Sequence, residues 1–278
     1  MNNPWNNRRP SARPPRATPL PRTEAPAPPG GGRGNTDELR LFGVNAVLAA
    51  FNKRPQAVRK VYLLEALIPR MQPLLKWCVA NRVGYRVVED GDLNKLSGTT
   101  HHEGIVADVQ RSPVLTLEEW LQDLPAGPAV ALWLDGVGNP HNLGAILRSA
   151  AHFGVAGLLL PETSTLGISG AAARVAEGGA ESVSLVRLPA TAEAMQMLRH
   201  AGFGLAATVV DGGTNVFAAS LPDRLVYVMG AESEGMDRQL AADCEQQVSI
   251  PGTGAVESLN VASATAVLLA QWAGARNS

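Results

Sequence analysis

The sequence predicts an α/β protein whose C-terminal half is a mostly parallel sheet covered by helices. From Ala129 onward, short apolar runs alternate with segments of helical periodicity, which is typical of a parallel sheet. Residues 39–111 show a similar alternation on a smaller scale. The first 36 residues hold nine prolines and four glycines, and too few large apolar groups to offset the entropy of ordering. We therefore expect a disordered arm (1–38), a small domain (39–111), a linker (112–128) and a large domain (129–278).

The small domain is expected to mix strands and helices. Leu41-Phe42-Gly43 leads into the first helix, whose apolar residues are spaced by three and four. The expected elements, in order, are a helix at 44–51, a strand at 59–64, a helix at 69–81, a strand at 85–88, a short helix at 90–96 and a strand at 104–109. One short helix, around 117–121, is expected in the connector that follows.

The large domain is expected to alternate strand and helix to its end. Its first strand is almost entirely apolar, as in strands covered on both faces. Expected strands are 129–134, 156–160, 183–188, 204–210, 225–229 and 248–250, and expected helices are 142–153, 170–177, 192–200, 236–242 and 259–271. Ligands of such sheets bind at loops that leave the carboxyl ends of strands. This rule selects three loops, Asp135–Asn142, Gly230–Gly235 and Pro251–Ser258.

Composition limits the class of protein. The chain has 278 residues, of which 45% are hydrophobic and 18% charged, as in globular proteins with a substantial core. It contains no apolar run of 18 residues, and its first ten residues lack the apolar segment of a secretory signal. We expect no membrane span and a cytoplasmic location. Cys78 and Cys244 have no metal-ligand or CxxC spacing, so reduced, packed thiols and no metal are expected.

The net charge of −1 conceals an asymmetry. Residues 1–36 carry a net charge of +5, and the other 242 residues carry −6. A basic arm on an acidic body is common in proteins that meet polyanions, although a solubilising tail has the same composition.

The first loop offers an amide and a guanidinium. Asn142 stands where a helix N-cap is expected, and Arg148 follows within two helical turns. Gly136-x-Gly138 lacks the third glycine of a dinucleotide fingerprint, which disfavours a nicotinamide-dependent oxidoreductase.

The second and third loops add turn glycines and polar groups. Gly230 and Gly235 permit a tight turn around Glu232, a hydrogen-bond acceptor. Ser258 or Asn260 could cap the last helix or face a ligand, and the absence of Gly-Lys-Ser/Thr disfavours a nucleotide triphosphatase.

These three loops, in this order, resemble the three motifs of the SpoU (TrmH-like) branch of the SPOUT RNA methyltransferases. The matching segments are 142–150, 230–235, and Ile250-Pro251 with 258–261, so that the resemblance covers 129–278. Residues 39–111, ending in His102-Glu103-Gly104-Ile105, resemble the small RNA-binding domain, similar to certain ribosomal proteins, that precedes the catalytic domain in many members. The chain is most similar to a tRNA/rRNA methyltransferase subgroup with an N-terminal extension.

The resemblance implies a reaction and a cofactor. Members transfer a methyl group from S-adenosylmethionine to a ribose 2′-hydroxyl of structured RNA, here tRNA or rRNA. They are homodimers with a trefoil knot, which departs from the unknotted rule. The implied cofactor-binding residues are Gly230, Ile250 and Leu259, with Met229 and Gly235 beside them. The implied catalytic residues are Arg148, Asn142, Glu232, Ser258 and Asn260. Relatives often have a serine directly after the third motif, where this chain has Ala262.

The role of Arg148 follows from its chemistry. Arginine is a poor base because it stays protonated in proteins. We therefore expect Arg148 to bind the adjacent phosphate and to stabilise the developing alkoxide. A base role would need strong local perturbation. The alternative function is an RNA-binding protein with a non-catalytic methyltransferase fold.

Other candidates have simpler explanations. His101 and His102 either contact RNA or lie in a solvated loop. The pattern His101-x-Glu103 is not followed by the Pro-Cys-x-x-Cys of a deaminase, so a deaminase is rejected. Four tryptophans, Trp77, Trp120, Trp133 and Trp272, are expected in the core or an interface. Four basic residues, Lys53, Arg54, Arg59 and Lys60, form either an RNA-facing patch or a solvated surface.

Overall fold

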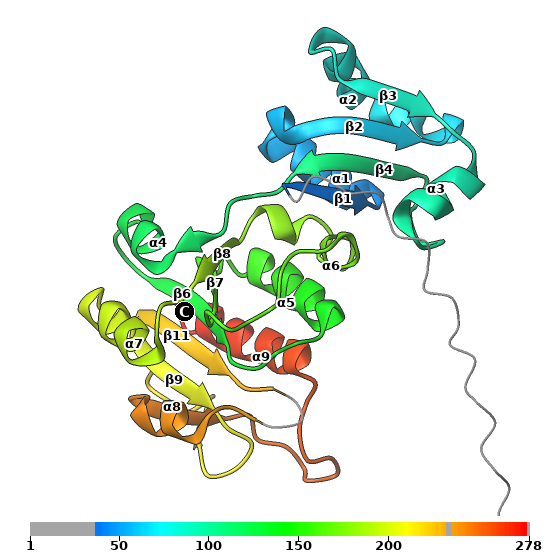
Figure 1. Cartoon of the computed structure of the whole chain (residues 1–278). Coiled ribbons are helices and arrows are strands. Elements are labelled where there is room, and N and C mark those ends of the chain that lie inside the picture. The colour runs from blue at the N-terminus through cyan, green and yellow to red at the C-terminus, as the bar shows by residue number, and fades with distance from the viewer. Residues whose placement is uncertain (1–36, 232–234, 277–278) are drawn as a thin grey trace, which may run out of the picture. The chain divides into compact units, whose positions relative to one another are not determined.

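The structure is a computed structural model that describes residues 37–231 and 235–276 (Figure 1). The expected disorder of the N-terminal arm therefore falls outside the described residues. The described chain contains two sheets, one of four strands and one of eight. We refer to residues 37–114 as the N-terminal part and residues 115–276 as the C-terminal part.

The N-terminal part is built on a four-stranded sheet with the order β1-β4-β2-β3. Its elements are β1 (Glu38–Phe42), α1 (Val44–Lys53), β2 (Val58–Leu63), α2 (Ile68–Ala80), β3 (Gly84–Val87), α3 (Asp90–Ser97) and β4 (Ile105–Gln110). Residues at alternate positions of β1 and β4 pack with α1 and α2, and α3 covers part of the opposite face through Leu93. Strand β1 was not expected, because its pairing with β4 joins segments far apart in sequence.

The C-terminal part is built on an eight-stranded sheet with the order β10-β12-β9-β11-β6-β7-β8-β5, and every neighbouring pair in it is parallel. The strands are β5 (Leu115–Thr116), β6 (Ala129–Leu134), β7 (Gly157–Leu160), β8 (Ser184–Arg187), β9 (Gly204–Thr208), β10 (Thr214–Asn215), β11 (Arg224–Met229) and β12 (Gln246–Ser249). All six residues of β6 are buried, as its apolar sequence predicted. The two-residue strands β5 and β10 were not expected.

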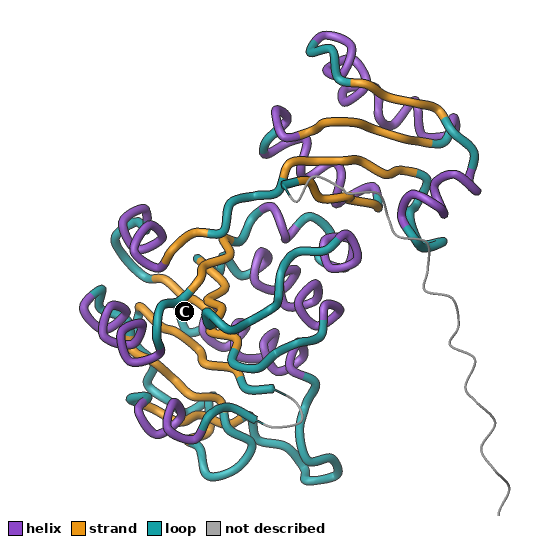
Figure 2. Tube along the Cα trace, viewed as in Figure 1, coloured by secondary structure: helices purple, strands orange, loops and turns teal. Residues whose placement is uncertain are grey.

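Helices cover both faces of this sheet (Figure 2). They are α4 (Leu117–Asp123), α5 (Pro140–His152), α6 (Gly170–Val175), α7 (Thr191–His200), α8 (Arg238–Asp243) and α9 (Val261–Gly274). Helices α5, α6 and α9 pack on one face, and α4, α7 and α8 on the other. The predicted mostly parallel α/β class is confirmed.

Three of the four tryptophans lie in the core. Trp120, Trp133 and Trp272 are buried, as expected, while Trp77 is half-buried against Phe51. Trp120 also donates a hydrogen bond to the carbonyl of Ala156 at 3.0 Å. The two cysteines are free thiols.

Polar contacts join the two parts. Arg54 makes a two-point contact with Glu181, at 2.6 and 2.9 Å. Glu103 accepts from the backbone of Val44 at 3.0 Å with one oxygen and contacts Arg174 at 2.9 Å with the other. Arg54 is therefore an internal partner of the C-terminal part and not a member of a solvated or RNA-facing patch.

Within the described residues, no helix has both the length and the apolar character needed to span a bilayer. The same residues contain no group of three or more His, Cys, Asp or Glu side chains placed to hold a metal ion.

Candidate active site at the carboxyl edge of the large sheet

Four neighbouring parallel strands, β12, β9, β11 and β6, deliver their following loops to one edge of the sheet. The three loops predicted from strand ends lie there. The loop after β9, at 209–213, lies between the second and third of them because β9 pairs with both β11 and β12. This loop is not among the three predicted from the sequence. The strand-end rule applies to it equally.

The first loop is fastened to the second. The backbone amide of Asp135 donates to the carbonyl of Met229 at 2.8 Å. Its carboxylate accepts from the amide of Asp237 at 3.0 Å. Gly136 has φ +74°, and a Cβ there would lie 3.2 Å from the Cβ of Ala231. These contacts fix the relative positions of the two loops.

The second loop turns back on itself directly after β11. Ala231 and Gly235 exchange backbone hydrogen bonds of 2.9 and 3.0 Å. A Cβ on Gly230 would lie 2.5 Å from the amide nitrogen of Met236 and 2.6 Å from the carbonyl carbon of Gly235. This turn therefore requires glycine at residue 230. Glu232, a predicted catalytic residue, lies outside the described residues.

Helix α5 begins two residues earlier than expected. Asn139 is the N-cap, since its side chain accepts from the amide of His141 at 2.9 Å, and Pro140 takes the first helical position. The expectation that Asn142 caps this helix is wrong, because the helix begins at Pro140 and Asn142 lies within its first turn. Asn139 takes the capping role, and the Asn142 side chain contacts the loop that precedes α9.

Arg148 lies on the exposed side of α5. The helix packs through Gly144, where a Cβ would lie 2.6 Å from the carbonyl oxygen of Ala172. His141, Ala145 and Arg148 follow at helical spacings of four and three, and His141 and Arg148 are exposed. Arg148 has no hydrogen-bond or ion-pair partner among residues 37–231 and 235–276, so its guanidinium is available to a ligand.

Asn260 links the third loop to the first helix. Its side-chain amide donates to Oδ1 of Asn142 at 3.1 Å. Its own Oδ1 accepts from the amides of Ala262 and Ser263, at 2.9 and 3.4 Å, and so caps α9. Of the two predicted cap residues, Asn260 fills the role, and Ser258 lies in the exposed segment before it.

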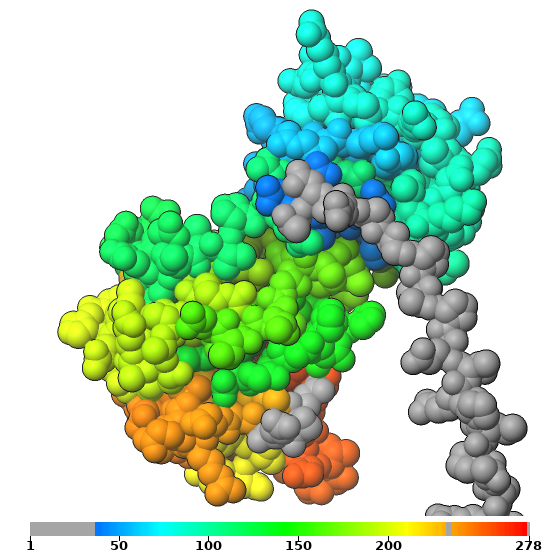
Figure 3. Space-filling view, in the orientation of Figure 1, coloured from blue at the N-terminus to red at the C-terminus, as the bar shows by residue number. Residues whose placement is uncertain are grey.

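The third loop presents apolar side chains at the same edge. Residues 251–260 are all exposed and form the red-orange projection at the lower right of the surface (Figure 3). Leu259 is 46% exposed, Val256 is 70% exposed, and Ile250 is half-buried against the core. An exposed apolar group, Val210, lies in the neighbouring loop after β9. Apolar groups are thus available beside the polar residues of the first and third loops.

Comparison with known proteins identifies the family. Residues 129–270 match the model of the SpoU rRNA methylase family. The chain belongs to the SpoU rRNA methylase family. Residues 40–115 match a second model, described as RNA 2′-O ribose methyltransferase substrate binding. The resemblance predicted from the three motifs is confirmed, and membership makes the chain an S-adenosylmethionine-dependent RNA 2′-O-methyltransferase.

Two relatives of this SpoU chain illustrate the similarity. An Escherichia coli O157:H7 protein named uncharacterized tRNA/rRNA methyltransferase YfiF is 38% identical over 86% of this chain and 69% of its own length. The 23S rRNA (guanosine-2′-O-)-methyltransferase RlmB of Shewanella oneidensis is 35% identical over 82% of this chain and 94% of its own length.

Solved structures share the fold. The AdoMet-bound rRNA methyltransferase of Sinorhizobium meliloti superposes with a TM-score of 0.73 at 21% identity, over 85% of this chain and 87% of that one. The SpoU methyltransferase AviRb of Streptomyces viridochromogenes, in complex with AdoMet, gives 0.72 at 24% identity, over 87% and 91%.

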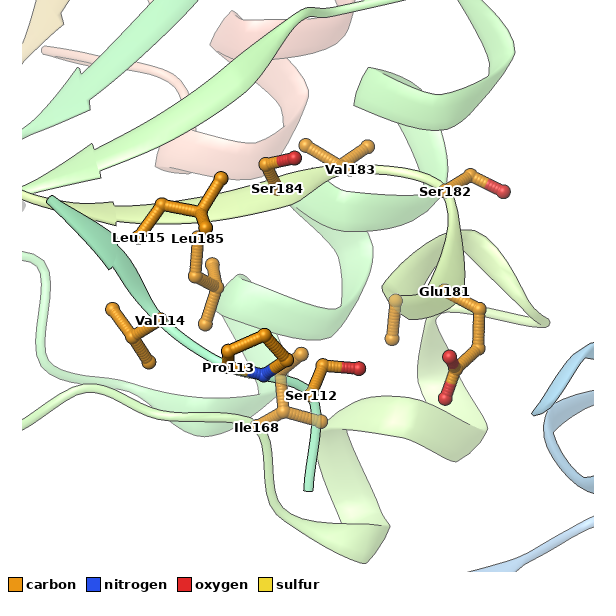
Figure 4. Close-up of a pocket in the computed structure, with 11 residues that line it drawn as sticks. Ser112, Pro113, Val114, Leu115, Ile168, Glu181, Ser182, Val183, Ser184 and Leu185 are labelled. Atoms are coloured by element: carbon orange, nitrogen blue, oxygen red, sulfur yellow. The ribbon is translucent and has the colours of Figure 1, made fainter. Parts of the chain in front are cut away.

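A separate pocket lies away from the SpoU motifs. It has a volume of about 230 Å³ beside β5 and β8, and Pro113, Val114 and Leu185 contribute to its walls (Figure 4). Among the residues that line it, only Glu181 carries a charge, and its carboxylate is already bound to Arg54. Its other polar side chains are the hydroxyls of Ser112, Ser182 and Ser184, and none of the motif residues lines it, so the pocket is separate from the candidate active site.

One buried tyrosine fastens α9 beneath the sheet. The hydroxyl of Tyr227 on β11 lies 3.4 Å from the carbonyl of Leu268 and 3.3 Å from Oε1 of Gln271. Burial raises the pKa of Tyr227, so that it stays a neutral hydrogen-bond donor. This contact helps to hold the helix that carries Asn260 at its N-terminus.

Proposed function

We propose that this chain methylates a ribose 2′-hydroxyl in structured tRNA or rRNA, with Arg148 acting on the RNA. The observation that carries the proposal is the hydrogen bond between Asn260 and Asn142. It joins the third motif to the first, beside the helix that carries Arg148. The named activities of the RlmB and YfiF relatives agree with RNA as the substrate.

We propose that the loops after β9, β11 and β12 hold S-adenosylmethionine. The described residues fit such a ligand. Leu259, Val210 and Val256 offer exposed apolar surface for an adenine ring, and the tight turn at Gly230 follows the neighbouring strand β11 at the same edge of the sheet. In this assignment Gly230, Ile250 and Leu259 hold the cofactor, with Met229 and Gly235 beside them. The AdoMet complexes of two neighbours with the same fold support the site.

When bound, S-adenosylmethionine would supply an electrophilic methyl group on a sulfonium, and transfer to the 2′-oxygen would release the neutral thioether S-adenosylhomocysteine and the proton of the hydroxyl. Arg148 then holds the phosphate next to the target ribose and stabilises negative charge that develops on the 2′-oxygen. Asn142 and Asn260 position the hydroxyl, and Glu232 and Ser258 add acceptors around it. Most of the acceleration of methyl transfer comes from positioning the two reactants.

The domain division accompanies this proposal. We assign residues 39–111 to RNA binding, 112–128 to a linker and 129–278 to methyl transfer, with the arm at 1–38.

Exposed apolar side chains near the site, Phe217 (59% exposed) and Val256 (70%), suit a subunit boundary and support a homodimer. A trefoil knot is part of the proposal, supported by the return of α9 to the face that α5 covers. A cytoplasmic location is proposed from the RNA substrate.

The proposal is tested by separate measurements of cofactor binding and transfer. Purified chain is titrated with S-adenosylmethionine and then incubated with the labelled cofactor and separate tRNA and rRNA pools. We expect saturable cofactor binding and label on one pool, and no label with Arg148→Ala. Binding of RNA without transfer to any pool would instead support the non-catalytic alternative.

A further inference from the structure

A cleft of about 460 Å³ lies where the N-terminal part meets the first turns of α5 and α6. Four of its lining residues carry cationic or imidazole side chains, namely Arg40, His101, His141 and Arg174. No Asp or Glu is among the residues that line it, although the whole chain has 25 acidic and 24 basic residues. The walls of the cleft therefore present hydrogen-bond donors without a carboxylate among them, and the acids that balance its arginines, Asp108 and Glu103, are not lining residues. Such a lining suits an anionic ligand.

The arginines of the cleft are held in place and keep donors available. Arg40 binds Asp108 at 2.7 Å, and this hydrogen bond raises the pKa of Arg40. Arg174 contacts Glu103 through one terminal nitrogen at 2.9 Å. Its Nε is shielded from solvent and has no hydrogen-bond partner among the described residues. A guanidinium has five donors, so both residues can bind a further acceptor.

The loop that carries His101 is fixed by its buried neighbour. His102 is 2% exposed, and its Nδ1 accepts from the amide of Gly104 at 3.0 Å. Its Nε2 lies 3.4 Å from Oδ1 of Asp90. The buried ring thus anchors the loop, and the side chain of His101 is exposed beside the cleft. This arrangement orders the binding group before a ligand arrives.

The cleft continues onto the helix of the proposed active site. His141 belongs both to the cleft lining and to the exposed stripe of α5 that carries Arg148. His141 and Arg148 are seven positions apart, which corresponds to about 10 Å along a helix. A polyanion bound by Arg148 can therefore extend along α5 into the cleft.

The other lining residues favour a nucleotide over a simple anion. Phe42, Leu96 and Val175 give the cleft an apolar wall, and Ser97 and Thr99 lie beside it. A base can pack against the apolar wall while its phosphate meets the basic groups. The volume lies in the range of small-molecule pockets.

We propose that this cleft binds a nucleotide of the substrate RNA that flanks the methylated one. The phosphate contacts the imidazoles of His101 and His141 and the arginines, and the base packs against Phe42 and Leu96. This inference rests on the proposed function, because it places the RNA on the same face as Arg148. The N-terminal part matches a family model described as substrate binding, and the inference names Arg40 and His101 as two of its RNA contacts.

The test introduces negative charge into the cleft without disturbing the fold. His141→Glu places a carboxylate in the first turn of α5, where negative charge stabilises a helix. His101→Glu changes an exposed loop side chain. The matched control is His200→Glu, an exposed histidine on α7 outside the cleft. Filter binding measures RNA affinity at several salt concentrations, steady-state kinetics give KM for RNA and kcat, and titration gives the affinity for S-adenosylmethionine.

We expect both cleft variants to raise Kd and KM for RNA roughly tenfold and to reduce the slope of log affinity against log salt by about 1. In the cleft variants, cofactor affinity and the thermal unfolding midpoint stay within experimental error. His200→Glu, at the C-terminal end of its helix, has a slightly lower unfolding midpoint but binds RNA and cofactor as wild type does. His141→Lys binds RNA at least as tightly as wild type.

The outcomes separate this inference from the proposed function. Methyl transfer with cleft variants within twofold of wild type in both Kd and KM would overturn the cleft and leave the function intact. Loss of RNA binding in the cleft variants of a protein that never transfers methyl would support the cleft and reject the function. An equal loss in His200→Glu would show a general charge effect and reject the cleft.

Discussion

Asn260 and Asn142, 118 positions apart in the chain, are joined by a hydrogen bond of 3.1 Å from Nδ2 of Asn260 to Oδ1 of Asn142. The same Asn260 caps α9 with its other side-chain atom. One residue therefore fixes the start of the last helix and positions the first motif. Two substitutions can separate these tasks.

Asn260→Asp keeps an oxygen that caps α9 but has no amide to donate to Asn142. We expect the free energy of unfolding to stay near that of wild type and methyl transfer to fall at least tenfold, because Asn142 loses its positioning contact. Asn260→Ala removes both functions and should also lower the free energy of unfolding by about 1 kcal/mol. Urea unfolding and steady-state kinetics on the two variants check this. Equal activity of Asn260→Asp and wild type would show that the Asn142 contact has no role in catalysis.

Arg148 is expected to act on the transition state. Because its guanidinium is exposed and has no described partner, Arg148→Ala should leave the free energy of unfolding unchanged within about 0.5 kcal/mol. The rate of methyl transfer should fall by two or more orders of magnitude, while the Kd for S-adenosylmethionine changes less than threefold. Arg148→Lys should recover part of the rate through phosphate attraction but lose the two-point contact. Single-turnover kinetics and calorimetric titration measure both quantities, and a near-normal rate in Arg148→Ala contradicts the assignment.

Gly230 is expected to be needed for the shape of the cofactor-binding loop. Gly230→Ala would place a methyl group 2.5 Å from the backbone nitrogen of Met236, so the turn must open. We expect affinity for S-adenosylmethionine to fall at least tenfold. Gly252→Ala is the matched control, because nothing lies within 4 Å of a Cβ there. Titration of both variants compares them directly, and equal affinities would remove the second loop from the cofactor site.

The junction between the two parts is expected to contribute to stability through Arg54 and Glu181. The side chains are 22% and 8% exposed, and removal of one partner leaves the other partly buried and unpaired. Glu181→Gln should lower the free energy of unfolding by about 2 kcal/mol. The more exposed ion pair between Arg199 and Glu245 serves as the comparison, because the Arg199 side chain is 40% exposed. Arg199→Gln should lower the free energy of unfolding by less than about 1 kcal/mol. A double-mutant cycle on Arg54 and Glu181 with no coupling energy would contradict this role.

Cys244 should be an unreactive thiol. Burial, followed by the nearby charge of Glu245, raises the pKa of Cys244 to about 11. Burial also raises the pKa of Cys78. The thiolate is the reactive form, so native-state labelling near pH 7.5 should be at least about 100-fold slower than that of a free cysteine and should accelerate as pH rises toward 11. A thiol-exchange reagent followed by absorbance tests this, with protein unfolded in guanidinium as the control. Rapid native labelling would show that the thiols are more accessible than described.

The sequence predicted most elements of the large sheet, because their order depends on local periodicity. Strand β6 has the expected bounds, 129–134, and its burial follows from its apolar composition. Strand β1 was missed because its stability comes from β4, more than 60 residues away. Asn139 and Asn142 both have the chemistry of a cap, and Pro140, which is favoured at the first helical position, is the sequence signal that selects Asn139.

Contacts between distant residues could not be predicted from local pattern. The motifs placed Asn142, Arg148 and Asn260 at one sheet edge, but the hydrogen bond between the two asparagines depends on the register of β6, β11, β9 and β12. The contact of Glu103 with Arg174 likewise depends on how the two sheets pack. The loop after β9 carried no motif, and its position between the second and third loops follows only from strand order.

Alkaline hydrolysis of the labelled RNA distinguishes ribose 2′-O-methylation from methylation of a base. The chain is incubated with RNA and S-adenosylmethionine labelled in the methyl group, and the RNA is then hydrolysed in alkali. Hydrolysis of RNA requires a free 2′-hydroxyl, so a 2′-O-methyl group protects the adjacent phosphodiester. We predict that the label is recovered in alkali-stable dinucleotides and that none appears with Arg148→Ala. Label recovered in mononucleotides, as expected for a methylated base, would contradict the account.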